Sequence, residues 1–162
     1  TQVNDYWRAG GLNVLSGLVR CGQQLPPGFV TKLLEVRLAM APAYARAAVA
    51  VAAPRVAGYL APHTRLEDTP EAYARYDWGL HHTLTVASGN PVYTLILNGF
   101  GGFYEQTAHH YFAPAEARAS SWAFYAALLA AAEKGDAAEA EQVTRRVMQE
   151  SIELWERVAR TA

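Results

Sequence analysis

The apolar positions along this chain recur with helical spacing, and nowhere do they alternate with polar positions as in a half-buried strand. The clearest example is the segment 91–112, for which the spacing predicts one helix with a mostly aromatic face. The side chains of this face lie three, four or seven residues apart: Tyr93, Ile96, Phe100, Tyr104 and Tyr111.

The same predicted helix contains three glycines, Gly99, Gly101 and Gly102. Each costs about 1 kcal/mol relative to alanine inside a helix. We therefore expect either a neighbouring helix that packs very closely here, or an aromatic wall that faces something other than protein.

Helix start and stop signals divide the whole chain into short-looped helical segments. Proline stands at or near the start of several of them, and Asp68 or Thr69 is placed to cap the helix that Pro70 begins. We expect helices over residues 4–9, 12–20, 26–52, 54–60, 70–87, 91–112, 114–135 and 136–160. Pro42 is expected to kink or break the third of these. Because short loops favour antiparallel neighbours, the fold class is predicted as all-α, an antiparallel bundle of six or seven helices.

Composition narrows the function class. A chain of 162 residues with a net charge of -1 is predicted to be one domain that does not hold nucleic acid by electrostatics. A single cysteine, Cys21, suits a reducing cytosol. No signal peptide is visible, and the most apolar run is interrupted by Arg46, Pro54 and Arg55, so we expect a cytoplasmic protein with no membrane partner.

Enzymatic motifs are missing from the sequence. It has no G-x-S-x-G elbow, no H-E-x-x-H and no glycine-rich phosphate loop. His81-His82 begins an acyltransferase-like H-H-x-x-x-D pattern, but Val86 stands at the position of its aspartate. We therefore predict that the protein is not an enzyme.

Asp77 and His81 lie four residues apart on one helix face, so both could reach one metal ion. A metal site needs at least a third protein ligand. The favoured interpretation is a carboxylate hydrogen-bonded to a partly buried imidazole.

The last helix offers a second candidate site. Ser151 and Trp155 share one face, with four arginines around it: Arg145, Arg146, Arg157 and Arg160. This group could stack a purine and bind its phosphates, or it could be an amphipathic helix with a core tryptophan and solvated arginines. Arg37 poses a similar choice within an apolar run, since it could reach the surface or supply a cation at a pocket mouth.

Six short motifs together resemble the effector-binding domain of the FadR family, the fatty-acid-responsive transcription regulators of the GntR superfamily. These motifs are VNDYW, GLNVL, LLEVR, ASGNPVYTLILNG, HYFAPAEAR and ESIELWERV, and the similarity covers essentially the whole chain. The resemblance implies a helical bundle that binds long-chain acyl-coenzyme A (acyl-CoA), with no further cofactor. It also implies an N-terminal winged helix-turn-helix that binds DNA, and a homodimer in the full-length protein. Residues 1–24 are expected to be linker helices that join this head, and residues 25–162 the effector-binding bundle, so Thr1 is expected to mark a truncation.

The resemblance also implies site residues. Those expected near the coenzyme or along the acyl cavity are Leu34, Arg37, Phe100, Tyr104, Tyr111, Tyr125, Glu150, Ser151, Trp155 and Arg160. Three positions depart from the family pattern: Met148 replaces a glycine, Leu38 a threonine and Val147 a tyrosine. Because methionine is much larger than glycine, Met148 is expected to affect how the pantetheine part of the coenzyme fits.

Related bundles of the superfamily bind a metal through one Asp and three His, and Asp77 with His81 matches half of that pattern. The other two positions hold Tyr125 and Val147, so we expect no metal and interpret the pair as a vestige. In the family, acyl-CoA binding releases DNA. Three other interpretations stay open: a metal-dependent sensor of a small carboxylate, a stand-alone acyl-CoA-binding protein, and an enzyme, which any turnover of acyl-CoA would indicate.

Overall fold

The structure is a computed structural model, and it describes residues 11, 14, 17 and 27–161. Within these residues it contains six long or medium α-helices, one short 3₁₀-helix and no strand. The elements are α3 (Phe29–Leu60), η1 (Ala61–Arg65), α4 (Pro70–Ala87), α5 (Pro91–Gly99), α6 (Gly101–Phe112), α7 (Ala115–Lys134) and α8 (Ala137–Thr161). The all-α prediction is confirmed. The helices expected over 4–9 and 12–20, and the linker assigned to 1–24, lie outside the described residues apart from positions 11, 14 and 17.

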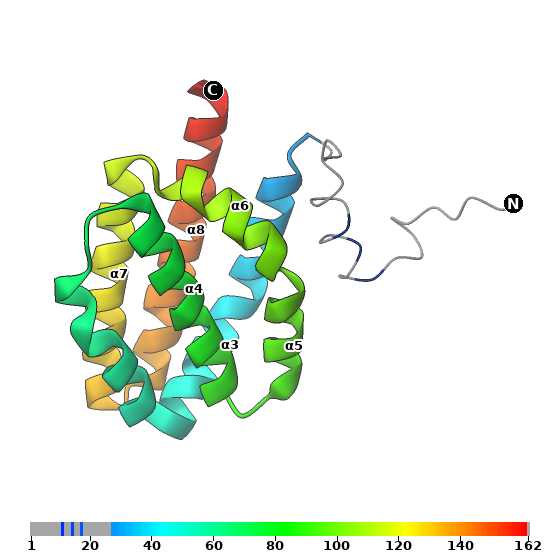
Figure 1. Cartoon of the computed structure of the whole chain (residues 1–162). Helices are drawn as coiled ribbons and strands as arrows, with labels where there is room; N and C mark the ends of the chain where they lie inside the picture. The colour runs from blue at the N-terminus through cyan, green and yellow to red at the C-terminus, as the bar shows by residue number, and fades with distance from the viewer. Residues whose placement is uncertain (1–10, 12–13, 15–16, 18–26, 162) are drawn as a thin grey trace, which may run out of the picture.

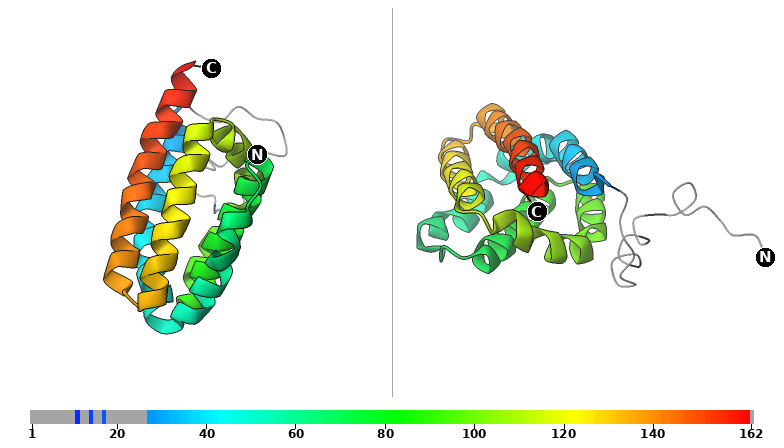
Figure 2. Two further views of the ribbon diagram at one scale, coloured as in Figure 1. Left: turned by 90° about the vertical axis from the view of Figure 1, so that its left-hand side faces the viewer. Right: turned by 90° about the horizontal axis from the view of Figure 1, so that it is seen from above.

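Helix α3 is the centre of the bundle. It packs against α8, α4 and α7, while α7 and α8 run side by side in opposite directions (Figures 1 and 2). Helices α5 and α6 lie on the same side of the bundle as α4, and they pack mainly against α4 (Figure 1). The core between the long helices is built from alanine, leucine, valine and aromatic side chains.

Local capping chemistry explains most helix boundaries. The Thr69 hydroxyl accepts a hydrogen bond from the Ala72 amide at 3.3 Å, which confirms the predicted cap of α4. Asn90 caps α5 in the same way. Gly135, with φ of 65°, ends α7, because a residue without a side chain adopts this left-handed conformation without strain. Asp136 then caps α8 as expected, since its carboxylate accepts from the Glu139 amide at 2.9 Å.

Of the two breaks predicted in α3, only the second is present. Pro42 is buried inside the helix without interrupting it. The break expected between residues 52 and 54 occurs as a kink at Ala52, whose φ and ψ of -145° and 45° are not helical, and the helix then continues to Leu60. By length and composition the stretch Phe29–Arg65 could cross a membrane, because its most apolar window has a mean hydropathy of 1.3. Its charged residues and prolines therefore interrupt the apolar run less than the sequence suggested. Central helices of water-soluble bundles pass the same test, and this one packs against three other helices.

The single helix predicted over 91–112 is wrong. The chain forms two helices, α5 and α6, that meet at Phe100, whose φ and ψ are -92° and -7°. The glycines lie at this junction rather than inside a helix, with Gly99 ending α5 and Gly101 beginning α6. A methyl group on Gly101 would lie 3.5 Å from the Trp78 ring, an ordinary van der Waals distance, so packing against α4 does not require glycine at this position.

Candidate ligand-binding site

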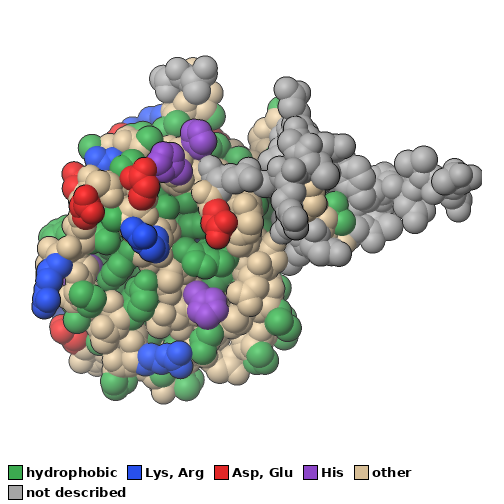
Figure 3. Space-filling model, viewed as in Figure 1, with side chains coloured by type: hydrophobic (Ala, Val, Ile, Leu, Met, Phe, Trp, Pro, Cys, Tyr) green, Lys and Arg blue, Asp and Glu red, His purple; other side chains and the backbone are tan. Residues whose placement is uncertain are grey.

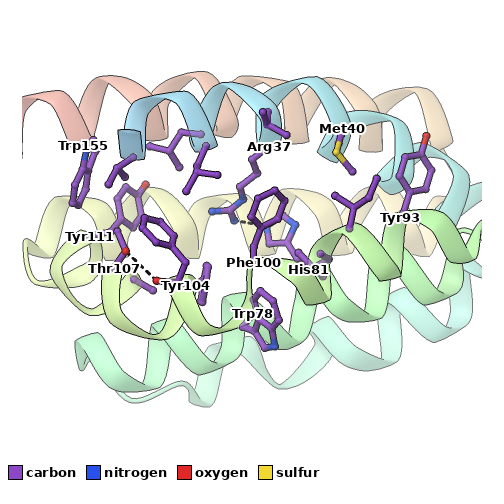
Figure 4. Close-up of a pocket in the computed structure, with 18 of the residues that line it drawn as sticks. Arg37, Met40, Trp78, His81, Tyr93, Phe100, Tyr104, Thr107, Tyr111 and Trp155 are labelled. Atoms are coloured by element: carbon purple, nitrogen blue, oxygen red, sulfur yellow. Dashed lines mark hydrogen bonds between the residues drawn. The ribbon is translucent and has the colours of Figure 1, made fainter. Parts of the chain in front are cut away.

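A cavity of about 110 Å³ lies between α3, α4, α5 and α6, with Trp155 of α8 at one end. Figure 4 shows Trp155 and Tyr93 at opposite ends of it, with Arg37 and His81 between them. Most of the wall is aliphatic or aromatic. Its shape and composition are those of a site for an apolar ligand.

Helical periodicity produces this wall. On α3, the lining residues follow one face at intervals of three or four: Val30, Leu33, Leu34, Arg37, Met40 and Tyr44. On α5 and α6, the aromatic face recognised in the sequence lines the opposite side of the cavity. The break at Phe100 leaves that face intact, because Phe100 itself is part of the wall.

A polar cluster lies at one side of the cavity, and its centre is Asp77, which is behind the lining residues Arg37 and Tyr104. This carboxylate is 3% exposed and accepts three hydrogen bonds: from Arg37 at 2.7 Å, Tyr104 at 2.8 Å and Tyr125 at 3.2 Å. Burial alone would raise the pKa of Asp77, but the Arg37 guanidinium and the hydrogen bonds lower it further than burial raises it. Asp77 is therefore ionised, and it raises the pKa of Arg37 against the opposing effect of burial.

Arg37 also donates to His81, and this contact determines the histidine tautomer. The Arg37 Nη2 lies 2.5 Å from His81 Nε2, and the Tyr44 hydroxyl lies 2.6 Å from His81 Nδ1. A guanidinium has only donors, so Nε2 must accept, and the ring hydrogen of the neutral imidazole is on Nδ1. Burial, followed by the Arg37 charge, lowers the pKa of His81 to about 3.

The direct hydrogen bond predicted between Asp77 and His81 is not formed. Their nearest atoms, Asp77 Oδ1 and His81 Nε2, are 3.8 Å apart, and His81 is 2% exposed rather than partly buried. Arg37 binds both side chains instead. This arrangement explains the pair better than a weak metal site does, because the guanidinium supplies the positive charge that a metal ion would bring.

The residues present do not fit a metal ion. Within the described part of the chain, no group of three or more His, Cys, Asp or Glu side chains converges on one point. Tyr125 hydrogen-bonds Asp77, and Val147 is a buried apolar residue. Two ligands that already share a guanidinium leave no coordination sphere for a cation.

A second, more open pocket of about 470 Å³ adjoins the first at the start of α3 and the end of α8. Val30 and Trp155 belong to the walls of both. Arg160 lines only the second pocket and is exposed there. The Trp155 indole thus lies between the apolar cavity and the surface pocket that contains the Arg160 cation. One ligand could place its apolar part in the cavity and its polar part in the surface pocket.

Six of the ten predicted site residues line the cavity: Leu34, Arg37, Phe100, Tyr104, Tyr111 and Trp155. Arg160 lines the neighbouring pocket. Arg37 is neither at the surface nor a free cation at a pocket mouth, since it is ion-paired with Asp77 inside the wall.

The other three predicted residues line neither pocket. Tyr125 is fully buried behind Asp77, because α7 lies on the far side of α4 from the cavity. The Ser151 hydroxyl is buried and donates to the Met148 carbonyl oxygen of its own helix at 2.7 Å. Glu150 is exposed. Burial is the main cause of the raised pKa of Tyr111, and the Glu150 charge adds a smaller effect in the same direction.

The positions that depart from the family pattern also lie outside both pockets. Met148 is 2% exposed and belongs to the main core, as does Val147, while Leu38 packs against that core. Met148 therefore does not obstruct either pocket.

Sequence reasoning missed Tyr44 and Trp78, both of which line the cavity. For Tyr44 a signal existed, since it lies seven residues after Arg37 and so on the same helix face. For Trp78 there was none, because its neighbour Asp77 faces Arg37 and only the position of α6 brings the Trp78 ring against Tyr104, with ring centroids 5.0 Å apart.

Charge does not mark the site on the molecular surface. On the face seen in Figure 1, acidic, basic and histidine side chains are dispersed among apolar and uncharged ones (Figure 3). The features that distinguish this site are its apolar interior and its buried ion pair.

The comparison with known proteins gives a consistent result. The family model for the FadR C-terminal domain matches residues 4–161. A fatty acid metabolism regulator protein of Shewanella halifaxensis is 42% identical over 125 residues, covering 77% of this chain and 52% of that relative. Those of Cronobacter sakazakii and Shewanella frigidimarina are 36% and 37% identical over 158 residues, each covering 98% of this chain and 66% of the relative.

The chain thus spans about half to two thirds of the length of these relatives. The helical bundle, the match along nearly the whole chain and the identity to several regulators agree. The chain belongs to the FadR C-terminal domain family.

Proposed function

We propose that this chain is the ligand-sensing domain of a transcription regulator of fatty acid metabolism, and that its ligand is long-chain acyl-CoA. The observation that carries the proposal is the apolar, aromatic cavity that ends at Trp155 beside a surface pocket containing Arg160. The relatives described above are fatty acid metabolism regulator proteins, which supports a role in the same process. Nothing among the described residues of the site suggests catalysis, because its charged and titratable groups, Asp77, Arg37 and His81, are bound to one another.

The acyl chain would occupy the cavity, which must widen to hold it. A volume of about 110 Å³ is well below the roughly 300–1,000 Å³ of ligand pockets. Helix α5 is the wall best suited to move, since none of its residues is buried. Burying each methylene contributes about 0.8 kcal/mol, and a long chain therefore provides ample energy to displace a lightly packed helix.

The coenzyme would lie in the adjoining pocket. There the Trp155 indole can stack on the adenine, and Arg160, which makes no ion pair with any described residue, can bind phosphate. Arg37 is less suited to this role than the sequence suggested. Its charge is already matched by Asp77, 2.7 Å away, so its contribution is to hold the inner wall.

In the full-length regulator, acyl-CoA would release DNA from an N-terminal head, with the protein acting as a homodimer. Such control requires two states of the bundle that differ in acyl-CoA affinity by several kcal/mol. Displacement of α5, followed by movement of α3 and α8 around Trp155, offers one source of this difference.

Calorimetric titration of the chain with oleoyl-CoA tests the proposal, with free coenzyme A and oleate as controls. We expect micromolar or tighter binding of oleoyl-CoA and much weaker binding of either control, because each control fills one pocket only. The absence of binding heat at two temperatures would refute it. Strong binding by a full-length protein that never contacts DNA would favour a stand-alone acyl-CoA-binding protein.

A metal-dependent sensor of a small carboxylate is the less favoured alternative. It requires a cation between Asp77 and His81, where Arg37 now binds both. Thermal unfolding with and without Zn²⁺ distinguishes the two, since only the metal site predicts a rise in melting temperature.

A further inference from the structure

The inner end of the cavity contains a hydrogen-bond donor without an acceptor. Because Arg37 forces His81 Nε2 to accept, His81 Nδ1 donates its hydrogen to the Tyr44 oxygen. The Tyr44 hydroxyl therefore keeps its own hydrogen for another partner. No described residue accepts it, although Tyr44 is 3% exposed and lines the cavity.

A buried hydroxyl hydrogen without an acceptor costs free energy unless a ligand or water accepts it. The position is held firmly: His81 fixes the Tyr44 oxygen, Arg37 fixes His81, and Asp77 fixes Arg37. This chain of contacts runs from the charged centre of the wall to one point in an otherwise apolar cavity.

That point lies far from the coenzyme pocket. Tyr44 packs edge-on against Tyr93, with ring centroids 5.7 Å apart, and Tyr93 is at the end opposite Trp155 (Figure 4). Along α3, the 14 residues from Val30, which borders both pockets, to Tyr44 correspond to about 20 Å. A ligand that extends inward from Trp155 therefore meets Tyr44 far from its thioester.

We propose that Tyr44 is a specificity-determining residue that recognises an oxygen on the distal half of the acyl chain, so that the domain responds to hydroxylated or oxo long-chain acyl-CoA as well as to plain chains. The inference rests on the proposed function, since it assumes that the acyl chain lies in this cavity. A hydroxyl or carbonyl at that depth accepts the Tyr44 hydrogen, which a methylene cannot do.

The test compares stearoyl-CoA with its 3-, 10- and 12-hydroxy derivatives, titrated into the wild-type chain, Tyr44→Phe and Tyr93→Phe. Tyr93→Phe is the matched control, because it removes a hydroxyl from the adjacent ring of the same wall. Thermal unfolding of each variant confirms that it is folded.

We expect Tyr44→Phe to weaken the 10- or the 12-hydroxy ligand about 2- to 10-fold, the contribution of one neutral hydrogen bond, and to leave stearoyl-CoA and the 3-hydroxy ligand unchanged. Tyr93→Phe should change none of the four. Equal losses for stearoyl-CoA and all hydroxy ligands in Tyr44→Phe, or no loss for any of them, would overturn the inference while leaving acyl-CoA binding intact. Failure of the wild-type chain to bind stearoyl-CoA would refute the proposed function itself.

Discussion

Replacing His81 by glutamine should remove most of the pH dependence of stability between pH 6.5 and 4.5. In the folded chain His81 is neutral, because burial and the Arg37 charge lower its pKa to about 3. In the unfolded chain the imidazole has its ordinary pKa of about 6.5. Glutamine keeps an acceptor for Arg37 and a donor for Tyr44 but binds no proton in this range.

The sign of this pH dependence follows from which state, folded or unfolded, binds a proton at His81. Above pH 6.5 both states hold a neutral His81, so it contributes no pH dependence. Between pH 6.5 and about 3 only the unfolded state is protonated, so acidification favours unfolding. Well below pH 6.5 the free energy of unfolding falls by about 1.4 kcal/mol per pH unit. The loss between pH 6.5 and 4.5 is about 2 kcal/mol, because at pH 6.5 half of the unfolded chains are already protonated.

Urea unfolding of both proteins at pH 7.0, 6.0, 5.0 and 4.5, followed by circular dichroism, measures this difference. Stopping at pH 4.5 keeps Asp77 ionised in both states, because its folded pKa is lowered and its stabilising effect is lost only at more acid pH. We expect the wild type to lose about 2.5 kcal/mol more than His81→Gln over this range. Parallel pH profiles, or a His81 NMR signal that titrates near pH 6.5, would refute the reasoning.

Three further predictions concern the wall and the packing around it. Asp77→Asn should lower the free energy of unfolding by about 3 kcal/mol, because its guanidinium partner stays buried without a counterion; wild-type stability in urea would contradict this. In calorimetric titrations, Trp155→Ala should weaken the binding of free coenzyme A and of acyl-CoA alike, whereas Tyr111→Ala should weaken only the binding of acyl-CoA. Equal losses of affinity for both ligands in Tyr111→Ala would be evidence against a site divided into a coenzyme pocket and an acyl cavity. Gly79→Ala should cost about 1–3 kcal/mol by overpacking, because its new methyl would clash with the Tyr59 hydroxyl. The double variant with Tyr59→Phe should recover part of that loss, and additive losses would exclude this contact as the cause.

The helices themselves were largely readable from the sequence, because their signals are local. A cap such as Thr69 acts on an amide three residues away, and Gly135 ends its helix by its own conformation. The family resemblance was readable too, and with it six of the cavity residues. The error at Phe100 was also local: the glycines were recognised as costly, but their effect was assigned to packing rather than to a helix break.

The site chemistry, by contrast, depended on contacts between residues 27 to 48 positions apart. The spacing of Asp77 and His81 placed them on one face but could not identify Arg37, from another helix, as the partner of both. The family resemblance likewise implied the same role for Tyr111 and Tyr125, whereas Tyr111 lines the cavity and Tyr125 is buried behind Asp77.

The sequence by itself determined the helical class, the capped boundaries and the family, because periodicity and capping involve residues within a few positions of each other. Only the tertiary structure decided that Arg37 is a structural cation, that His81 is neutral with its hydrogen on Nδ1, and that Tyr44 has a hydrogen to donate. These properties arise from burial and from the relative placement of α3, α4 and α6. Neither is encoded in any short stretch of the chain.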